Sequence, residues 1–193
     1  MKTTLSTLGY ALLSLLAREA ASGYDLTRQL QAPVGFFWRA RHSQIYPELA
    51  RLEADGLVAH EVVAQQDLPD KKVYTVTPAG LAALRAWLTE PIEMAVLRDE
   101  MMLKSFSMWL AEPQDLLPLF RDQVRQHQQQ LQVYYGLQQK LEQHGAVRAM
   151  DWHAYEFATY LTLQKGIRYE RQYLEWCEWV IGMLERSAAS QEE

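Results

Sequence analysis

Residues 42–57 read HSQIYPELARLEADGL, and the apolar residues of this segment are spaced as in a helix. Ile45, Leu49 and Leu52 recur at intervals of four and three, which predicts an amphipathic helix with one inward face. Gly56 follows the last apolar position, and glycine is the residue that most often ends a helix. The segment therefore predicts one short helix that buries a single apolar stripe.

Two further helices are expected upstream of this segment. The first carries apolar residues at i, i+3, i+4, i+7 and i+8, namely Leu8, Ala11, Leu12, Leu15 and Leu16. The second opens at Ser22-Gly23-Tyr24-Asp25 and turns Leu26 and Leu30 inward. Ser22 and Asp25 form a capping-box pattern, in which each side chain bonds the other residue's backbone N–H.

A hairpin and a fourth helix are expected downstream. The runs Val58–Ala64 and Lys71–Val76 are rich in β-formers and flank a polar turn, which predicts the hairpin. Thr77-Pro78 supplies an N-cap and a first-turn proline for the helix. Three helices, a hairpin and a helix within 90 residues is the order of a winged helix-turn-helix domain, so residues 1–90 are predicted to be a DNA-binding domain.

Residues 91–193 have an almost purely helical pattern. We expect helices from about Arg98 to Ala111, from Pro113 to Gln143 and from Asp151 to Arg186. The last of them carries eight aromatic residues: Trp152, Tyr155, Phe157, Tyr160, Tyr169, Tyr173, Trp176 and Trp179. So many rings cannot all fit inside a small helical layer, so we expect them to face another subunit, a ligand or both. The predicted fold class is therefore mainly α with a small β-hairpin wing, and the exposed rings favour a second, helical domain that serves dimerisation, effector binding or both.

Composition narrows the class of protein. The chain has 193 residues, is 49% hydrophobic and carries a formal net charge of −5. The acidic surplus lies in residues 91–193, while residues 1–90 hold nine basic and nine acidic side chains. We expect neither a transmembrane helix nor a signal peptide. The single cysteine, Cys177, excludes an internal disulfide framework and suits a reducing cytoplasm, where we expect it as a small core residue.

The outward face of the helix over 42–54 is the expected DNA-reading surface. The side chains at its centre are small, and those at its N-terminal end are polar. Gln44 can form two hydrogen bonds with adenine, and Ser43 can contact several bases. Arginines nearby would neutralise phosphates, and two lysines of the wing would meet the adjacent backbone or minor groove. The expected DNA contacts are Arg39, Arg41, His42, Ser43, Gln44, Tyr46, Pro47, Arg51, Lys71 and Lys72. Three acidic residues are expected to oppose this basic surface: Glu48, Glu53 and Asp55.

The chain resembles the PadR family of transcriptional repressors, and within it the longer phenolic-acid-responsive type. The string His42-Ser43-Gln44-Ile45-Tyr46-Pro47-Glu48-Leu49 is the most specific match. Other matching strings are Leu8-Gly9-Tyr10-Ala11-Leu12-Leu13, Ser22-Gly23-Tyr24-Asp25-Leu26, Phe37-Trp38, Lys71-Lys72-Val73-Tyr74-Thr75 and Arg98-Asp99-Glu100. The match continues more weakly into the last helix, around Tyr160-Leu161.

The resemblance implies a homodimer that binds a near-palindromic double-stranded operator and leaves it when a small aromatic acid, a hydroxycinnamate, binds. It also implies a ligand site between the winged domain and the C-terminal helices. Such a ligand needs a flat apolar slot and a cationic or hydrogen-bonding end. Candidates for the slot are Phe37, Trp38, Trp109, Trp152, Tyr155 and Tyr160, and candidates for the polar end are Lys104, Arg168 and Tyr24. Thr159 stands where related chains can carry a histidine. This difference from the family pattern bears on which acid binds and not on the fold.

Two alternatives stay open. A repressor of drug-efflux genes would bind flat cationic compounds and would use acidic residues beside its rings, for which Glu156, Glu170 and Glu175 are available. A helical adaptor would instead use the aromatic last helix to grip another protein. We expect no enzymatic activity, no metal and no cofactor, because the sequence has neither a glycine-rich phosphate loop nor a recognisable catalytic arrangement.

Overall fold

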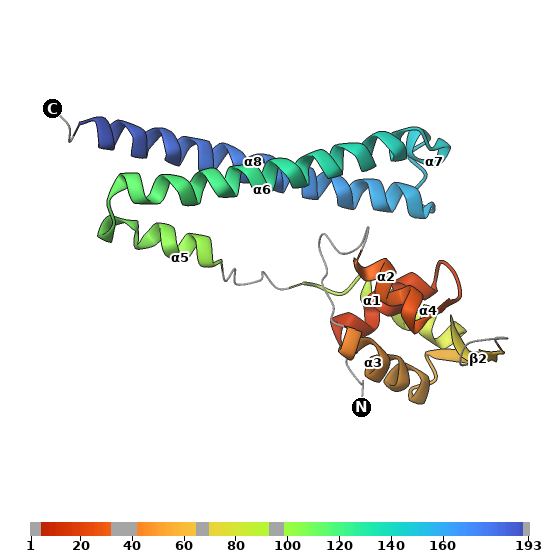
Figure 1. Ribbon diagram of the computed structural model, residues 1–193. Helices are drawn as coiled ribbons and strands as arrows, with labels where there is room; N and C mark the ends of the chain where they lie inside the picture. Colours follow the sequence, from red (N-terminus) through yellow and green to blue (C-terminus); the bar gives the residue numbers. More distant parts are fainter. Residues whose placement is uncertain (1–4, 32–41, 65–69, 93–98, 191–193) are drawn as a thin grey trace. The chain divides into compact units, whose positions relative to one another are not determined.

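The computed structural model describes residues 5–31, 42–64, 70–92 and 99–190 (Figure 1). The chain divides into two compact units, Met1–Met94 and Ala95–Glu193, and each is described by itself. Over the described ranges, no helix combines the length and apolar content needed to cross a lipid bilayer.

The N-terminal unit has the predicted order of three helices, a hairpin and a fourth helix. Its helices are α1 (Thr7–Leu16), α2 (Gly23–Gln31), α3 (His42–Ala54) and α4 (Pro78–Trp87). Its strands are β1 (Ala21–Ser22), β2 (Val58–Val63) and β3 (Lys71–Val76). The winged helix-turn-helix fold expected from the sequence is thereby confirmed.

The three strands form one antiparallel sheet in the order β1-β3-β2. In the hairpin, Val58 pairs with Val76 at the base and Val63 pairs with Lys71 at the tip. Strand β1 was not predicted: its Ser22 pairs with Val73 in the middle of β3. This short ladder joins the entry of α2 to the inner half of the wing.

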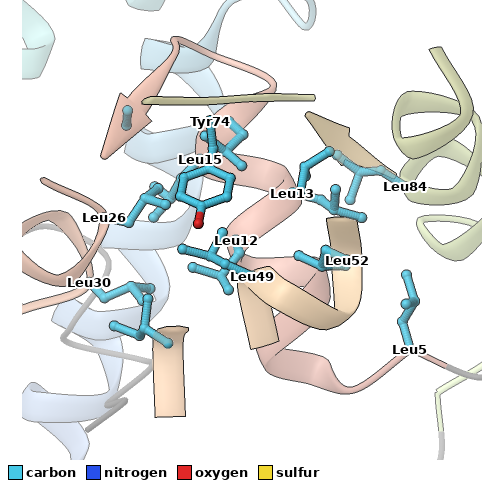
Figure 2. Close-up of a cluster of buried hydrophobic side chains, with 14 residues drawn as sticks. Leu5, Leu12, Leu13, Leu15, Leu26, Leu30, Leu49, Leu52, Tyr74 and Leu84 are labelled. Atoms are coloured by element: carbon cyan, nitrogen blue, oxygen red, sulfur yellow. The ribbon is translucent and has the colours of Figure 1, made fainter. Parts of the chain in front are cut away.

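Leucines from all the helices fill the core of this unit (Figure 2). Ile45, Leu49 and Leu52 are fully buried, as the apolar spacing predicted. They meet Leu12 and Leu26, which are also fully buried, so α3 is fixed on its inward side by α1 and α2. The helix ends where predicted, since Gly56 has a φ of +69° that side chains rarely adopt.

Capping interactions fix where α2 and α4 begin. The backbone N–H of Asp25 donates to the Ser22 hydroxyl over 3.2 Å, and the backbone N–H of Ser22 donates back to the Asp25 carboxylate over 3.4 Å. This is the predicted capping box. Thr77 caps α4 by accepting from the backbone N–H of Gly80 over 3.1 Å, and Pro78 follows it as expected.

The described part of the C-terminal unit consists of helices and the turns that connect them. It contains α5 (Glu100–Phe106), the 3₁₀ turn η1 (Met108–Leu110), α6 (Pro113–Glu142), α7 (Gly145–Arg148) and α8 (Tyr155–Ala189). Helices α6 and α8 run side by side in opposite directions, with α5 along their N- and C-terminal halves respectively (Figure 1). Fully buried Phe120 of α6 and Cys177 of α8 lie in the core between them, which confirms the expected core position of the cysteine.

Two expectations for this unit were wrong in detail, and one short helix was missed. Helix α5 ends at Phe106, because Ser107 leaves the helical conformation and η1 follows. Trp152 lies before the last helix, which starts only at Tyr155; the Asp151 side chain accepts the backbone N–H of His153 over 2.9 Å and holds this segment in a turn. The four-residue helix α7 was not predicted at all.

Candidate nucleic-acid interface and effector residues

The outward face of α3 is exposed to solvent, and the side chains at its centre are small. The side chains of Ser43, Gln44 and Pro47 are exposed, and Tyr46 and Arg51 flank them. Because Ile45, Leu49 and Leu52 bury the opposite face, this surface is the one that α3 can present to a partner. Its first turn is the polar end, where a recognition helix contacts base edges.

Glu48 does not lie on this outward face, contrary to the expectation from sequence. Its side chain is buried, and its Oε1 accepts a hydrogen bond from the Ser6 hydroxyl over 2.5 Å. Its Oε2 lies 3.3 Å from the guanidinium of Arg51. The carboxylate therefore joins α3 to α1 and holds Arg51 from beneath, so it places no open negative charge on the candidate DNA surface.

Glu53 is also occupied, because its carboxylate contacts Nδ1 of His60 on β2. Of the three acidic residues expected to oppose the basic surface, only Asp55 is exposed, in the turn after α3. The outward face of α3 is therefore less acidic than the sequence suggested.

Tyr46 rests against the start of α2. A Cβ built on Gly23 would lie only 2.6 Å from Cε1 of Tyr46, so only glycine leaves room for the ring. Sequence reasoning missed this contact and treated Gly23 only as part of a capping pattern. The contact adds a second link between the two helices of the helix-turn-helix.

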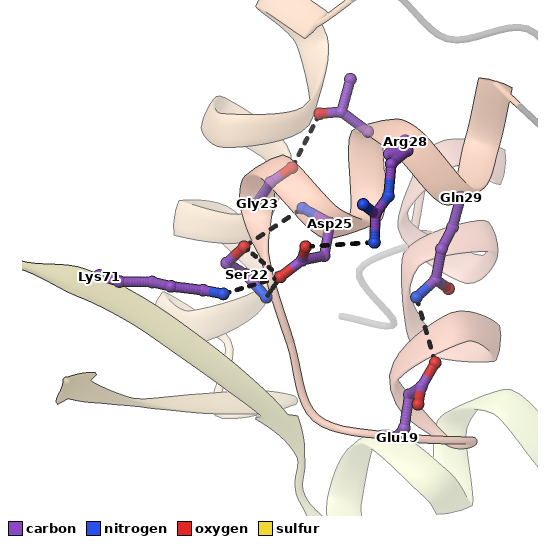
Figure 3. Close-up of polar contacts among 8 residues, drawn as sticks. Glu19, Ser22, Gly23, Asp25, Arg28, Gln29 and Lys71 are labelled. Carbon is purple, nitrogen blue, oxygen red and sulfur yellow. Dashed lines mark hydrogen bonds and ion pairs between the residues drawn. The ribbon is translucent and has the colours of Figure 1, made fainter. Parts of the chain in front are cut away.

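The two wing lysines have different surroundings. Lys71 Nζ lies 3.0 Å from Oδ2 of Asp25, and the Ser22 hydroxyl donates to the same oxygen over 2.6 Å (Figure 3). The Ser22 hydrogen bond and then Lys71 lower the pKa of Asp25 to about 2. Lys72 is exposed and forms no ion pair with any described residue.

Arg39, Arg41, Phe37 and Trp38 lie outside the described residues. His42 is the first residue of α3, but its side chain is not described.

The effector candidates of the C-terminal unit form two separate groups. Trp152 packs edge-on against Phe157 with ring centroids 5.3 Å apart, and Phe157 stacks on Tyr160 at 6.5 Å. The Tyr160 hydroxyl lies 3.5 Å from Glu142, at the C-terminal end of α6, and Tyr155 is half-buried one helical turn earlier. This first group therefore lies where α6 ends and α8 begins.

Lys104 and Trp109 lie before the other end of α6. A 30-residue helix is about 45 Å long, so this second group is far from Tyr160 within one chain. Lys104 pairs with Glu100 over 2.9 Å, and Trp109 is 78% exposed. Arg168, in the middle of α8, donates to the carbonyl of Gln164 over 3.0 Å.

Tyr24 belongs to the N-terminal unit, on α2, and is 65% exposed. The described residues of either unit alone thus do not gather the candidates into one slot.

Sequence reasoning also missed a polar cluster between α6 and α8. His127 contacts the carboxylate of buried Glu170 and stacks on Tyr173 with ring centroids 3.8 Å apart. Burial raises the pKa of Tyr173 to about 12, assisted by nearby Cys177 and Asp99. Glu170 is thus already engaged and is a poor candidate for a cationic ligand. Within the described residues, no three His, Cys, Asp or Glu side chains converge as a metal site would require.

Comparison with known proteins connects this architecture to a family. A model described as the transcriptional regulator PadR-like family matches residues 12–86, and one described as virulence activator alpha C-term matches residues 97–185. The negative transcriptional regulator PadR of Bacillus subtilis is 35% identical over 181 residues, which are 93% of this chain and 98% of that protein. The chain belongs to the PadR family. The two matched regions fall within the two units, so each unit of this PadR-family regulator has its own family counterpart.

Solved structures of the relative agree with this assignment. Bacillus subtilis PadR in complex with operator DNA has a TM-score of 0.83 and 33% identity, over 93% of this chain and 99% of that one. The same protein in complex with p-coumaric acid has a TM-score of 0.78 and 33% identity, over the same shares. The operator DNA and the p-coumaric acid are ligands of Bacillus subtilis PadR. The fold of this chain is similar to the fold of that protein in both complexes.

Proposed function

We propose that this PadR-family regulator is a homodimeric repressor that binds operator DNA through α3 and is released by a phenolic acid. The observation that carries the proposal is the outward face of α3. The face is exposed and small at its centre, while buried Ile45, Leu49 and Leu52 hold the opposite side on the core. Bacillus subtilis PadR, which shares this fold, binds operator DNA.

On DNA, Gln44 and Ser43 would read base edges from the first turn of α3. Arg51 would contact phosphate, since Glu48 holds its guanidinium from the inner side. His42, Tyr46 and Pro47 complete the α3 surface in this proposal. Arg39 and Arg41 on one side, and Lys72 of the wing on the other, would supply further positive charge along the backbone, with Lys71 next to Lys72 at the tip of the wing.

The homodimer is supported by apolar side chains that α5 and η1 leave in water. Leu103, Phe106 and Leu110 are 66–81% exposed, and Trp109 is exposed with them. Isolated exposed apolar residues are common, but four large ones within residues 103–110 favour an interface. A second copy of the chain would cover them, and two-fold symmetry would pair the recognition helices for a near-palindromic operator.

For the effector, we propose a hydroxycinnamate, because Bacillus subtilis PadR binds p-coumaric acid. Tyr155, Tyr160 and Trp152 would offer ring contacts. The other candidates stay as proposed contacts: Phe37, Trp38, Tyr24, Lys104, Trp109 and Arg168. The acid would release DNA by favouring a dimer whose recognition helices do not fit the operator, and only its differential affinity for the two states can shift their balance.

We propose a cytoplasmic location, because a bacterial repressor must reach the chromosomal DNA. The single buried thiol, Cys177, is consistent with a reducing compartment. Nothing in the proposed role calls for catalysis.

The proposal is tested by selecting binding sites from a random duplex library and measuring affinity for the best site by fluorescence anisotropy. We expect tight binding that weakens steeply with salt and is abolished by p-coumaric acid. Binding that ignores p-coumaric acid but responds to a flat cationic dye would replace the phenolic acid with the efflux-type ligand. Failure to select any DNA would contradict the repressor and favour a helical adaptor.

A further inference from the structure

The wing of the N-terminal unit is tied to the helix-turn-helix in two places. The first is the β1–β3 ladder, in which Ser22 pairs with Val73. The second is the ion pair between Lys71 of β3 and Asp25 of α2, with Nζ and Oδ2 3.0 Å apart. Lys71 pairs with Val63 at the tip of the hairpin, so the ion pair holds the wing beyond the point where the ladder ends.

The carboxylate in this pair is itself fixed. Its Oδ2 accepts the Ser22 hydroxyl over 2.6 Å and the Ser22 backbone N–H over 3.4 Å, while Arg28 is 3.8 Å from its Oδ1 (Figure 3). Lys71 is thus held by an oriented acceptor on α2. The helix α2 in turn contacts α3, where Tyr46 lies against Gly23. A continuous series of contacts therefore runs from α3 through α2 to Lys71 at the wing tip.

Without the ion pair, the tip end of β3, Lys71 and Lys72, would be held only by its pairing with β2. A two-stranded hairpin is only marginally stable in water, so its tip would move relative to α3. Lys72, the next residue, is exposed, and successive side chains of a strand point to opposite faces. When Lys71 faces Asp25 on α2, Lys72 therefore faces away from α2, so the two lysines do not contact the same partner.

We propose that Lys71 is a positioning residue, which ties the wing tip to Asp25 and so aims Lys72 at the DNA backbone. The inference rests on the proposed DNA-binding function and assigns different roles to the two wing lysines. Lys72 supplies the phosphate contact, and Lys71 sets where that contact is made.

The first arm of the test uses the full chain without DNA and follows amide hydrogen exchange in Lys71→Met, Asp25→Asn and Lys72→Met. Asparagine keeps an oxygen for the Ser22 hydroxyl but removes the charge. We expect faster exchange at the hairpin tip in the Lys71 and Asp25 variants alike, with no change in α1 and none in Lys72→Met. An unchanged tip in either of the first two variants would overturn the tether.

The second arm measures anisotropy on the selected duplex over a range of salt concentrations. Lys71→Met and Asp25→Asn should each weaken binding about two- to fivefold, as expected for a partly exposed ion pair. Their combination should lose no more than either alone, and the slope of log affinity against log salt should not change. Lys72→Met should reduce that slope by about 1.8, because the proposed homodimer loses one phosphate contact in each of its two wings.

The alternative, in which Lys71 itself contacts phosphate and Asp25 competes for it, predicts the opposite sign for one variant. Asp25→Asn would then tighten DNA binding, and Lys71→Met would flatten the salt slope. Either result would overturn the positioning role. If the unaltered chain selects no DNA, the proposed function fails and with it the aiming of Lys72, while the exchange arm still decides the tether.

Discussion

The hydroxyl of Ser6 donates a hydrogen bond to Oε1 of Glu48 over 2.5 Å and thereby joins the N-cap of α1 to the middle of α3. The same hydroxyl accepts the backbone N–H of Gly9 over 3.0 Å. A Cβ on Gly9 would lie 2.7 Å from Glu48 Oε1, so the glycine leaves space for the carboxylate. One buried acid thus fixes how the recognition helix sits on its scaffold.

Removing either partner should destabilise the N-terminal unit, and the two losses should not add. We expect Ser6→Ala to cost about 1 kcal/mol, since it removes a helix cap, and Glu48→Ala to cost about 2 kcal/mol, since it also opens the buried site. Urea unfolding of both variants and of the double variant measures their coupling. Exposed Glu61→Ala serves as the control and should change stability by less than about 0.5 kcal/mol. Strictly additive losses would contradict the bond.

Two helical glycines should respond to alanine with opposite signs. At Gly80 in α4, a Cβ would lie 2.1 Å from the backbone oxygen of Leu57, so Gly80→Ala should destabilise the protein by about 1–3 kcal/mol. At Gly136 in α6, a Cβ meets nothing within 4 Å, so Gly136→Ala should stabilise the protein by about 0.5–1 kcal/mol through helix propensity. Thermal unfolding of the two variants decides this, and equal shifts would refute it.

The carboxylate of Asp25 should make stability depend on pH in the acid range. Its pKa in the folded protein is about 2, below its ordinary value near 3.8, because Ser22 and Lys71 bond the charged form. The unfolded chain therefore takes up the proton first as pH falls, and the contribution is complete above about pH 4 and lost between pH 4 and 2. About a quarter of the side chain is exposed, so we expect about 1 kcal/mol.

Urea unfolding at pH 6 and at pH 2.5 checks this expectation. The difference in stability between the unaltered chain and Asp25→Asn should be fully present at pH 6 and should fall to about a third of that value at pH 2.5, where the folded carboxylate is still largely ionised. A difference that stays constant over this range would assign the effect of the substitution to something other than the charge.

The sequence predicted the helices and the hairpin of the N-terminal unit well because each of them has a local signal. Periodic leucines, the Ser22–Asp25 box and the Thr77-Pro78 start depend on neighbours within one or two turns. Strand β1 was missed since two residues carry no periodicity, and its pairing with Val73 joins segments 51 residues apart. The position of Glu48 was misjudged for the same reason: charged residues are seldom buried, and its partner Ser6 lies 42 residues away.

The candidate effector residues were harder to predict than the α3 surface. Aromatic content shows that rings are available, but which rings meet depends on the antiparallel register of α6 and α8, and on parts of the molecule beyond one unit. That register pairs Tyr160 with Glu142 and leaves Trp109 far away. It also buries Glu170 against His127, which the polar pattern of α6 concealed.

The single thiol should be unreactive in the folded protein. Burial raises the pKa of Cys177 to about 11, so the thiol stays protonated at pH 8 and has no access to solvent. We expect no reaction with a disulfide reagent such as DTNB at pH 8 and one equivalent of reaction in guanidinium. Rapid reaction without denaturant would show that the α6–α8 core opens readily.

Gln44 should decide sequence preference rather than overall affinity. It lies in the first exposed turn of α3, where a recognition helix approaches base edges, and its amide can bond adenine with two hydrogen bonds. Gln44→Ala should therefore weaken binding to the best selected duplex by about 1–3 kcal/mol and leave binding to random duplex unchanged. Lys72→Met is the matched control, because loss of a phosphate contact weakens both duplexes alike. If Gln44→Ala also weakens both alike, the base contact must come from another residue of α3, and Ser43 is the next to test.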